Sequence, residues 1–249
     1  MREVVAFTTI RQGNSLNDIE KVRSEVFLDT SKALYDWGIP CIAMSVDCDS
    51  SYRETIERFG VITLPQKTKG MGNVRREALQ ATLSLFSHAS YFFWLEPEKP
   101  QMPRFVKPML KLMKEKNAFL GLFNRMSVNS YPEEQAHYYL FCKAVASKLL
   151  DIDLDYAFGP MILSKNALPY FLDYESKHGD KWDSILIPRL RIIKDNHPIA
   201  LLSIDFKNDS RMTGVESGNP KAILKRIEQF NNVIPSLIEE LENYKYPQS

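Results

Sequence analysis

Short apolar runs alternate along the first half of the chain with segments in which apolar residues recur every three or four positions. The runs are typical of buried strands, and the recurring segments are typical of helices that bury one face. The pattern predicts strands at residues 4–10, 42–46, 61–64, 91–95 and 118–123, and helices at residues 19–34, 52–59, 74–86 and 103–116. This alternation with short loops predicts an α/β fold with a mostly parallel central sheet flanked by helices.

The alternation weakens after residue 125. The later pattern predicts helices at residues 133–150, 166–174, 183–194 and 222–244, and strands at residues 158–164 and 199–206. Because the chain shows no internal repeat, low-complexity tract or linker, we expect one domain over residues 1–249. Its first half, residues 1–125, is of the nucleotide-binding type, and residues 126–249 form a more elaborate half that ends in a helix.

The composition narrows the possible partners. Hydrophobic residues at 44% and charged residues at 25% are ordinary for a globular protein, and the net charge of +1 argues against a general nucleic-acid or membrane-surface binder. No stretch approaches the ~18 apolar residues of a membrane span. The chain begins with a strand-like run rather than an apolar signal region, and its three cysteines have no zinc spacing, so we expect a cytoplasmic location.

The strand at residues 91–95 is followed at once by Glu96, Pro97 and Glu98. Pro97 keeps the chain extended, so two carboxylates lie at the carboxyl end of a buried strand, where open α/β sheets bind their ligands. Such a pair is suited to a divalent cation and, through it, a diphosphate. The alternative is a strand that ends in charged residues because it has reached water.

A basic, glycine-containing loop precedes the next helix. Its glycines, Gly70 and Gly72, permit close backbone approach to an anion, and Lys69 and Arg75 carry charge that suits phosphate. The loop is neither a P-loop nor the Rossmann fingerprint, since it lacks the Gly-Lys-Ser/Thr ending and the third glycine. The alternative is a flexible basic turn.

Further polar residues follow the first two strands. Thr8, Thr9 and Arg11 end the first strand, and Asp47 follows the second, where it is placed to accept hydrogen bonds from a base or ribose. Their alternatives are ordinary strand-end polarity and the turn chemistry of aspartate.

Trp182 and Asp183 open a predicted helix in the second half. An aromatic ring beside a carboxylate suits a sugar site, while the alternative is an acidic residue that stabilises the helix start. The four histidines have no i, i+4 partner, and no G-x-S-x-G motif is present, which excludes an H-E-x-x-H zinc helix and argues against a serine hydrolase.

Taken in order, these features resemble the GT-A fold of nucleotide-diphospho-sugar transferases. The resemblance spans roughly the first 200 residues. It rests on the strand that ends in Thr8 to Arg11, on Asp47, on the loop from Lys69 to Arg75, and on the acidic-x-acidic motif at Glu96 and Glu98. Downstream, Gly159 and Pro160 resemble the loop that receives the acceptor, and Trp182 and Asp183 resemble the acidic residue on the helix below the sugar.

The resemblance implies a glycosyltransferase, of hexosyltransferase type, that moves a sugar from a nucleotide-diphosphate donor to a small-molecule, glycan or protein acceptor. Residues 1–125 then form the donor half and residues 126–249 the acceptor half. The implied donor residues are Thr8, Thr9, Arg11, Asp47, Lys69, Gly70, Gly72 and Arg75. The implied acceptor residues are Gly159, Pro160 and Trp182, with Asp183 as the catalytic base or orienting carboxylate.

The resemblance also implies Mn²⁺ or Mg²⁺ held by Glu96 and Glu98. The sequence departs from the family's Asp-x-Asp pattern, because both positions are Glu with a Pro between them. The late histidine ligand of many members is also missing, although Asp205 lies where it could substitute.

Two alternatives stay open at this point. One is a protein of the same fold that binds a nucleotide sugar without catalysis. The other is a sugar-phosphate nucleotidyltransferase, whose glycine-rich loop normally follows the first strand, where this chain has only Gly13.

Overall fold

The computed structural model describes residues 3–11, 17–46 and 48–245. Its strands are β1 (Val4–Arg11), β2 (Cys41–Val46), β3 (Val61–Pro65), β4 (Tyr91–Trp94), β5 (Leu120–Arg125), β6 (Met161–Ser164) and β7 (Ile199–Ile204). Its helices are α1 (Asp18–Asp36), α2 (Ser50–Glu57), α3 (Met71–Leu85), α4 (Pro103–Lys116), α5 (Glu133–Leu150), a 3₁₀ turn (Lys165–Ala167), α6 (Leu168–Leu172), α7 (Asp183–Lys194), α8 (Ser210–Glu216) and α9 (Pro220–Lys245).

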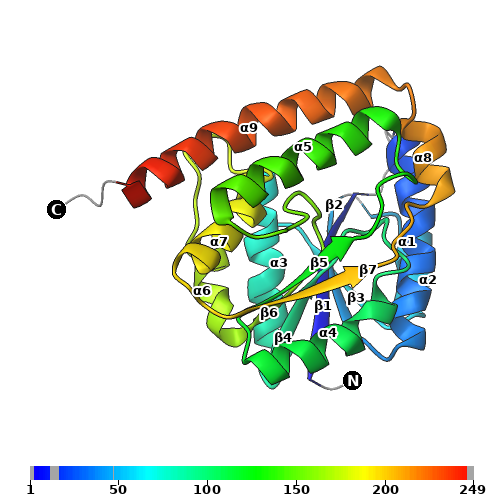
Figure 1. Cartoon of the computed structure of the whole chain (residues 1–249). Helices are drawn as coiled ribbons and strands as arrows, with labels where there is room; N and C mark the ends of the chain where they lie inside the picture. Colours follow the sequence, from blue (N-terminus) through cyan, green and yellow to red (C-terminus); the bar gives the residue numbers. More distant parts are fainter. Residues whose placement is uncertain (1–2, 12–16, 47, 246–249) are drawn as a thin grey trace.

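The strands form one sheet in the order β3-β2-β1-β4-β6-β5-β7. Neighbouring strands are parallel except at β6, which runs antiparallel to both β4 and β5. The sequence prediction of a single α/β domain with a mostly parallel sheet flanked by helices is confirmed (Figure 1).

The unbroken apolar runs of the strands serve two cores, one on each face of the sheet. Successive side chains of a strand point to opposite faces, so Val4 and Ala6 pack into one core while Val5 and Phe7 pack into the other. Helices α1, α2 and α4 contribute to the first core, and α3, α6 and α7 contribute to the second. The central strands are therefore buried on both faces, as parallel strands between helices must be.

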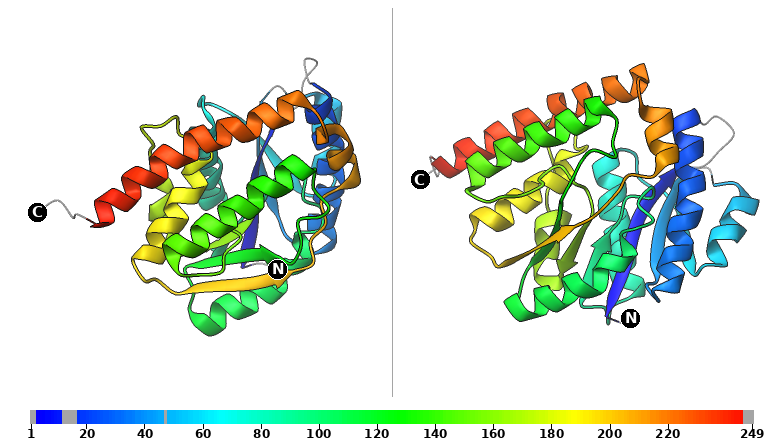
Figure 2. Two further views of the ribbon diagram at one scale, coloured as in Figure 1. Left: turned by 45° about the horizontal axis from the view of Figure 1, so that its top comes forward. Right: turned by 45° about the vertical axis from the view of Figure 1, so that its right-hand side comes forward.

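The strand order reverses beside β1, which pairs with β2 on one side and β4 on the other. In open α/β sheets this reversal opens a crevice at the carboxyl ends of the strands. Helices α5 and α9 lie side by side across this end of the sheet (Figures 1 and 2). Residues of both helices line one pocket together with the residues that follow β4.

Several element boundaries differ from the sequence prediction for local reasons. Strand β6 begins only at Met161, because the carbonyls of Tyr156, Phe158 and Gly159 accept hydrogen bonds from the buried Arg189 guanidinium instead of from a neighbouring strand. Helix α3 begins three residues earlier than predicted, at Met71. Helix α8 was not predicted; its first turn is capped by the side chain of Asp209.

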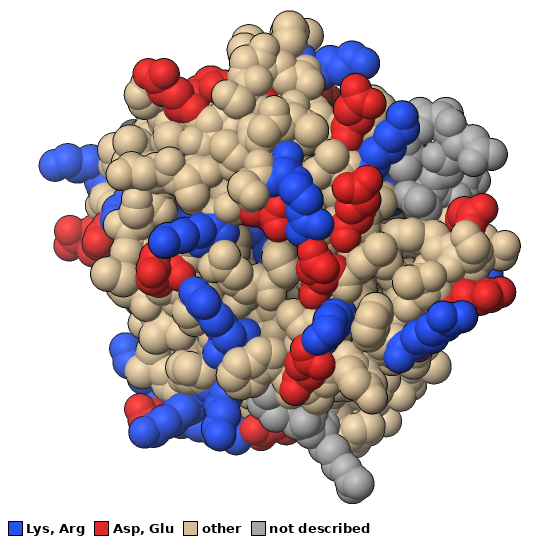
Figure 3. All heavy atoms as spheres, turned by 90° about the vertical axis from the view of Figure 1, so that its right-hand side faces the viewer, with Lys and Arg blue, Asp and Glu red and all other residues tan. Residues whose placement is uncertain are grey.

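The charges are well mixed on the face that Figure 3 displays, where Lys and Arg side chains are interspersed with Asp and Glu. This agrees with the net charge of +1. None of the described helices is long and apolar enough to span a membrane.

Candidate functional site

A groove with a volume of about 410 Å³ lies at the carboxyl ends of β1, β2 and β3. This volume falls in the range of small-molecule sites, which is roughly 300–1,000 Å³. The groove is lined by Thr9, Ile10, Arg11, Glu20, Arg23, Val46, Gln66, Gly70, Met71 and Val74. All of these residues come from the first half of the chain.

Three predicted donor residues, Thr9, Arg11 and Gly70, lie in this groove. The Arg11 guanidinium is exposed and forms an ion pair of 3.3 Å with Glu20. Gly70 precedes α3 with a φ of 95°, a conformation that glycine adopts without strain. Thr8 is fully buried and does not line the groove, and Asp47 lies outside the described residues.

Gly72 has a different role from the one predicted. Its backbone N–H donates a 2.8 Å hydrogen bond to the carbonyl of Asp180, and a Cβ at this position would lie 2.3 Å from the Asp180 carboxylate. Arg76 binds the same carboxylate. The glycine therefore lets a loop of the second half approach α3, and the start of the helix is covered by protein at this point.

Arg75 also contacts protein rather than lining the groove. Its guanidinium donates to the hydroxyl of Ser184 at 2.9 Å and to the carbonyl of Lys181, and lies 5.3 Å from the centroid of the Trp94 ring. Burial lowers the pKa of Arg75 to about 10, so it stays charged at neutral pH. Lys69 of the same loop is exposed and lies outside the lining of the groove.

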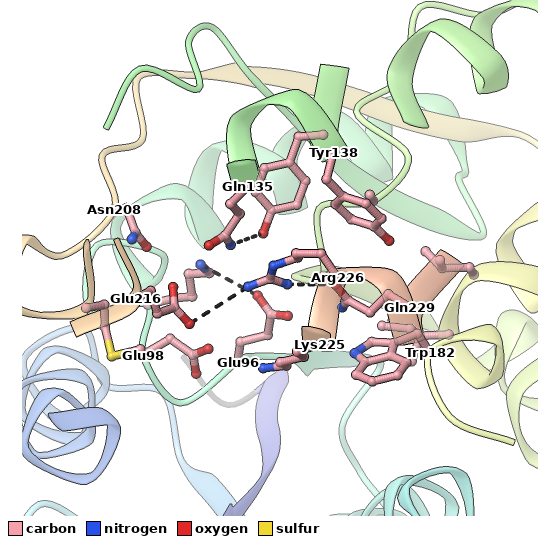
Figure 4. A pocket seen from close by; sticks show the side chains of 17 residues that line it. Glu96, Glu98, Gln135, Tyr138, Trp182, Asn208, Glu216, Lys225, Arg226 and Gln229 are labelled. Carbon is pink, nitrogen blue, oxygen red and sulfur yellow. Dashed lines mark hydrogen bonds and ion pairs between the residues drawn. The ribbon is translucent and has the colours of Figure 1, made fainter. Parts of the chain in front are cut away.

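A second pocket, with a volume of about 50 Å³, brings together four predicted residues: Glu96, Glu98, Gly159 and Trp182 (Figure 4). Helices α5 and α9 close it with polar side chains, namely Gln135, Lys225, Arg226 and Gln229. This volume is well below the roughly 300–1,000 Å³ of small-molecule sites. An acceptor molecule needs some of these side chains to move.

Glu98 forms an ion pair with Arg23 of α1, with 3.3 Å between Oε2 and Nε. Burial alone would raise the pKa of Glu98, but Arg23, Lys99 and Lys225 outweigh it and lower this pKa to about 2. The carboxylate is thus ionised and surrounded by cations of the chain itself.

Glu96 lies 3.8 Å from the ammonium of Lys99 and packs against Gly159, where a Cβ would come within 2.4 Å of its Oε1. Lys99 is buried, donates to the Tyr131 hydroxyl at 3.1 Å and faces the rings of Phe158 and Phe206 as well. Aromatic faces and a carboxylate together stabilise a desolvated ammonium. Gly159, which has no side chain, leaves the space that the Glu96 carboxylate occupies.

The surroundings of the two glutamates do not fit a divalent cation between them. Among the described residues, no three His, Cys, Asp or Glu side chains converge as a metal-ligand group. Lys99 is paired with Glu96 and Arg23 with Glu98, and hard divalent cations need several oxygen ligands. These glutamates instead act here as partners of the chain's own cations.

Asp183 is fully buried and does not line the pocket. Its carboxylate accepts hydrogen bonds from the backbone N–H of Lys181 at 2.7 Å and from the hydroxyl of Ser236 at 2.9 Å. A general base must reach the proton that it takes, so this placement favours the structural alternative for Asp183. Pro160 is buried beside Gly159 and does not line the pocket either.

Four cations of the site were not predicted: Arg23, Lys99, Lys225 and Arg226. Burial and the nearby Arg23 and Arg226 lower the pKa of Lys225 to about 8. Arg226 donates to Gln229 at 2.7 Å and pairs with Glu216 at 3.8 Å. In the sequence, the only sign of these cations is the adjacent pair Lys225 and Arg226 on a predicted helix. Such basic residues are more often solvent-exposed than part of a site.

No protein-family model and no curated protein matches this sequence. Among solved structures, the chain is similar to glucosyl-3-phosphoglycerate synthase from Mycobacterium tuberculosis in complex with Mn²⁺, UDP and phosphoglyceric acid. The TM-score is 0.63 at 12% identity, over 95% of this chain and 78% of that one. It is also similar to mannosyl-3-phosphoglycerate synthase from Rubrobacter xylanophilus, with a TM-score of 0.54 at 12% identity, over 92% of this chain and 75% of that one.

A candidate nucleotide-diphospho-sugar transferase from Desulfovibrio desulfuricans G20 is similar over 98% of this chain and 99% of its own, with a TM-score of 0.54 at 10% identity. The chain has the GT-A-like fold of nucleotide-diphospho-sugar transferases. The resemblance that the sequence motifs suggested is therefore confirmed at the level of fold.

Proposed function

We propose that the chain is a glycosyltransferase of hexosyltransferase type, which moves a sugar from a nucleotide-diphosphate donor to an acceptor. The observation that carries this proposal is the groove at the carboxyl ends of β1 to β3, which contains Thr9, Arg11 and Gly70. The adjoining pocket contains Glu96 and Trp182. A nucleotide-sized groove beside a polar pocket supports a donor site and an acceptor site in one crevice.

The origin of the lining residues supports a division of labour between the two halves. The groove is built from residues 9–74 alone, which fits a donor half. The pocket combines Glu96, Glu98 and Lys99 with residues 135–229 of the second half, which fits an acceptor half. Sugar transfer at the junction would bring the donor's anomeric carbon toward the pocket.

Positive charge at the groove would serve the departing diphosphate. The exposed Arg11 lines the groove, and Lys69 lies in the loop that precedes α3. Fixed charge aimed at a leaving group that becomes more negative in the transition state is commonly worth several kcal/mol. A solved structural neighbour contains Mn²⁺. Here the two glutamates are paired with cations of the chain, so no step is assigned to a metal.

A binding protein without catalysis is the second candidate. It is favoured by the pocket, where both glutamates already have cationic partners and only about 50 Å³ is open. Such a protein would bind the nucleotide sugar in the groove and leave it intact.

Incubation of the chain with UDP- and GDP-hexoses and a panel of acceptors separates these functions. We expect release of free UDP or GDP, and Glu96→Gln should slow this release while leaving donor affinity in place. Binding without release would favour the binding protein, and pyrophosphate formed from a nucleoside triphosphate and a sugar phosphate would favour nucleotidyl transfer. Absence of nucleotide binding would contradict the proposal.

A further inference from the structure

Arg23 lies at the boundary between the groove and the pocket. It belongs to α1 and contributes to the lining of the groove. On its other side it pairs with two glutamates of the pocket, Glu98 at 3.3 Å and Glu216 at 3.9 Å. Arg23 is thus held by carboxylates from the loop after β4 and from the end of α8, with its charge beside the groove.

The guanidinium of Arg23 carries N–H groups that make no hydrogen bond to the rest of the described chain. Within the described part of the chain, Nε and Nη2 of Arg23 are buried and neither makes a hydrogen bond, although both take part in ion pairs. A buried donor without an acceptor destabilises the fold, and an acceptor from a ligand would relieve this cost. Among the described residues, Nη1 of Arg23 is neither buried nor hydrogen-bonded, and the side chain keeps 24% of its surface exposed, so a ligand reaches the guanidinium from this end.

The charges around Glu98 oppose a divalent cation at the same place. Besides Arg23, the ammonium groups of Lys99 and Lys225 act on this carboxylate. An added ion of charge +2 would be repelled by these three neighbouring positive charges. Such an ion would also compete with Arg23 for the oxygens of Glu98.

We propose that the guanidinium of Arg23, oriented by Glu98 and Glu216, binds the diphosphate of the donor in place of a divalent cation. The planar fork of arginine matches two phosphate oxygens at once, which a lysine ammonium does not. This inference rests on the proposed function, because it assigns the charge that holds the donor. Glu98 acts here as a positioning residue rather than as a metal ligand.

The first test uses the unmodified chain. Titration with UDP and with GDP is followed calorimetrically in EDTA and again with Mn²⁺, and Mn²⁺ alone is titrated and followed by its electron paramagnetic resonance signal. We expect nucleotide affinity to agree within about twofold between the two buffers, which is less than ~0.5 kcal/mol. We also expect no Mn²⁺ binding at micromolar concentrations.

The second test uses substitutions of Arg23. Arg23→Lys keeps the charge beside Glu98 and Glu216 but loses the planar fork, and we expect nucleotide affinity in EDTA to fall by about tenfold, or ~1.4 kcal/mol. Arg23→Gln removes the charge and should weaken binding further. The matched control is Lys32→Gln, which removes one positive charge from the exposed side of the same helix, where Lys32 pairs with Asp36.

The outcomes distinguish this inference from the proposed function. Nucleotide binding that requires Mn²⁺, or Mn²⁺ binding that disappears in Glu98→Gln, would overturn the inference and leave the proposed function intact. If Arg23→Lys and Lys32→Gln bind nucleotide equally well, Arg23 does not contact the diphosphate. If the unmodified chain binds neither UDP nor GDP in either buffer, the proposed function fails, and with it the role of Arg23. Should Arg23→Gln fail to fold, the unmodified chain and Arg23→Lys still decide the matter.

Discussion

Arg75 was predicted to bind phosphate, but in the structure its guanidinium contacts other residues of the chain. The sequence places it in a basic loop before a helix, where phosphate binding is a reasonable expectation. In the structure the loop ends earlier, and the side chain projects from α3 toward Lys181, Ser184 and Trp94. Its contacts join the two halves of the chain, which local sequence does not reveal.

We therefore expect Arg75→Ala to reduce stability rather than nucleotide affinity. Loss of hydrogen bonds from a charged group costs about 1.5–3 kcal/mol, and this loss should appear as a lower denaturation midpoint. Lys69→Ala is the matched comparison, since Lys69 is exposed in the preceding loop and its removal should leave the midpoint unchanged. A fall in UDP or GDP affinity with unchanged stability in Arg75→Ala would restore the role of a diphosphate contact.

Asp183 offers a similar choice between chemistry and structure. Because its carboxylate is buried and bonded to Lys181 and Ser236, we expect Asp183→Asn to lower the free energy of unfolding by about 1–3 kcal/mol. Donor affinity should not change, since the groove is built from the first half of the chain. If stability is retained while sugar transfer falls by ~10²-fold or more, Asp183 is catalytic after all.

At the scale of elements, α9 contributes three side chains to the pocket, and this contribution was not predicted from the sequence. Its apolar repeat predicts the helix well. The predicted start at residue 222 is two residues from the observed Pro220, and the predicted end at residue 244 is one residue from Lys245. The buried side of α9, however, carries polar residues such as Arg226, Gln229 and Asn232. Periodicity identifies a helix, but it does not tell which distant residues its polar side meets.

Asn232 connects α9 to the start of α7. Its side-chain oxygen accepts hydrogen bonds from the backbone N–H groups of Trp182 at 3.0 Å and Asp183 at 3.3 Å, and its amide donates to the carbonyl of His178 at 2.6 Å. The first N–H groups of a helix have no partner within it, so this side chain acts as a cap from another element.

Asn232→Ala should consequently lower the free energy of unfolding by about 1–3 kcal/mol, measured by chemical denaturation. Asn232→Asp should recover part of the loss, because a carboxylate still accepts from the two N–H groups. The neighbouring Asn231 is exposed, so Asn231→Ala serves as the control and should change stability by less than ~0.5 kcal/mol. Equal losses in the two alanine variants would show that helix propensity, rather than capping, is responsible.

At the scale of the whole molecule, the sheet follows from the sequence more directly than the site does. Strand–helix alternation is a local signal, and it was sufficient to predict β1 to β5 and their parallel arrangement. The contacts that shape the site join residues about a hundred positions apart, as between Arg76 and Asp180, which are 104 residues apart. Glu96, Glu98 and Gly159 could be predicted from their positions in the sequence. The cations Arg23 and Lys225, which act on Glu98, lie on helices whose placement depends on the completed fold.

The groove provides the last prediction, because its lining residues all belong to the donor half. A nucleotide that binds the folded chain should raise its melting temperature, by an amount equivalent to about 2.7 kcal/mol at a hundred times Kd. Arg11 lines this groove, and its side chain is 61% exposed, so its ion pair with Glu20 should contribute little to stability, ~1 kcal/mol or less.

Arg11→Ala should therefore melt close to the unmodified chain without ligand, yet bind UDP or GDP about tenfold more weakly, a loss of ~1.4 kcal/mol. The exposed Arg58, which ends α2 and lies outside the groove lining, supplies the control: Arg58→Ala should retain the full thermal shift. A nucleotide that raises the melting temperature of Arg11→Ala as much as that of the unmodified chain would mean that it binds elsewhere. In that case we would expect the nucleotide to bind in the pocket with Glu96 and Trp182, which is the other predicted part of the crevice.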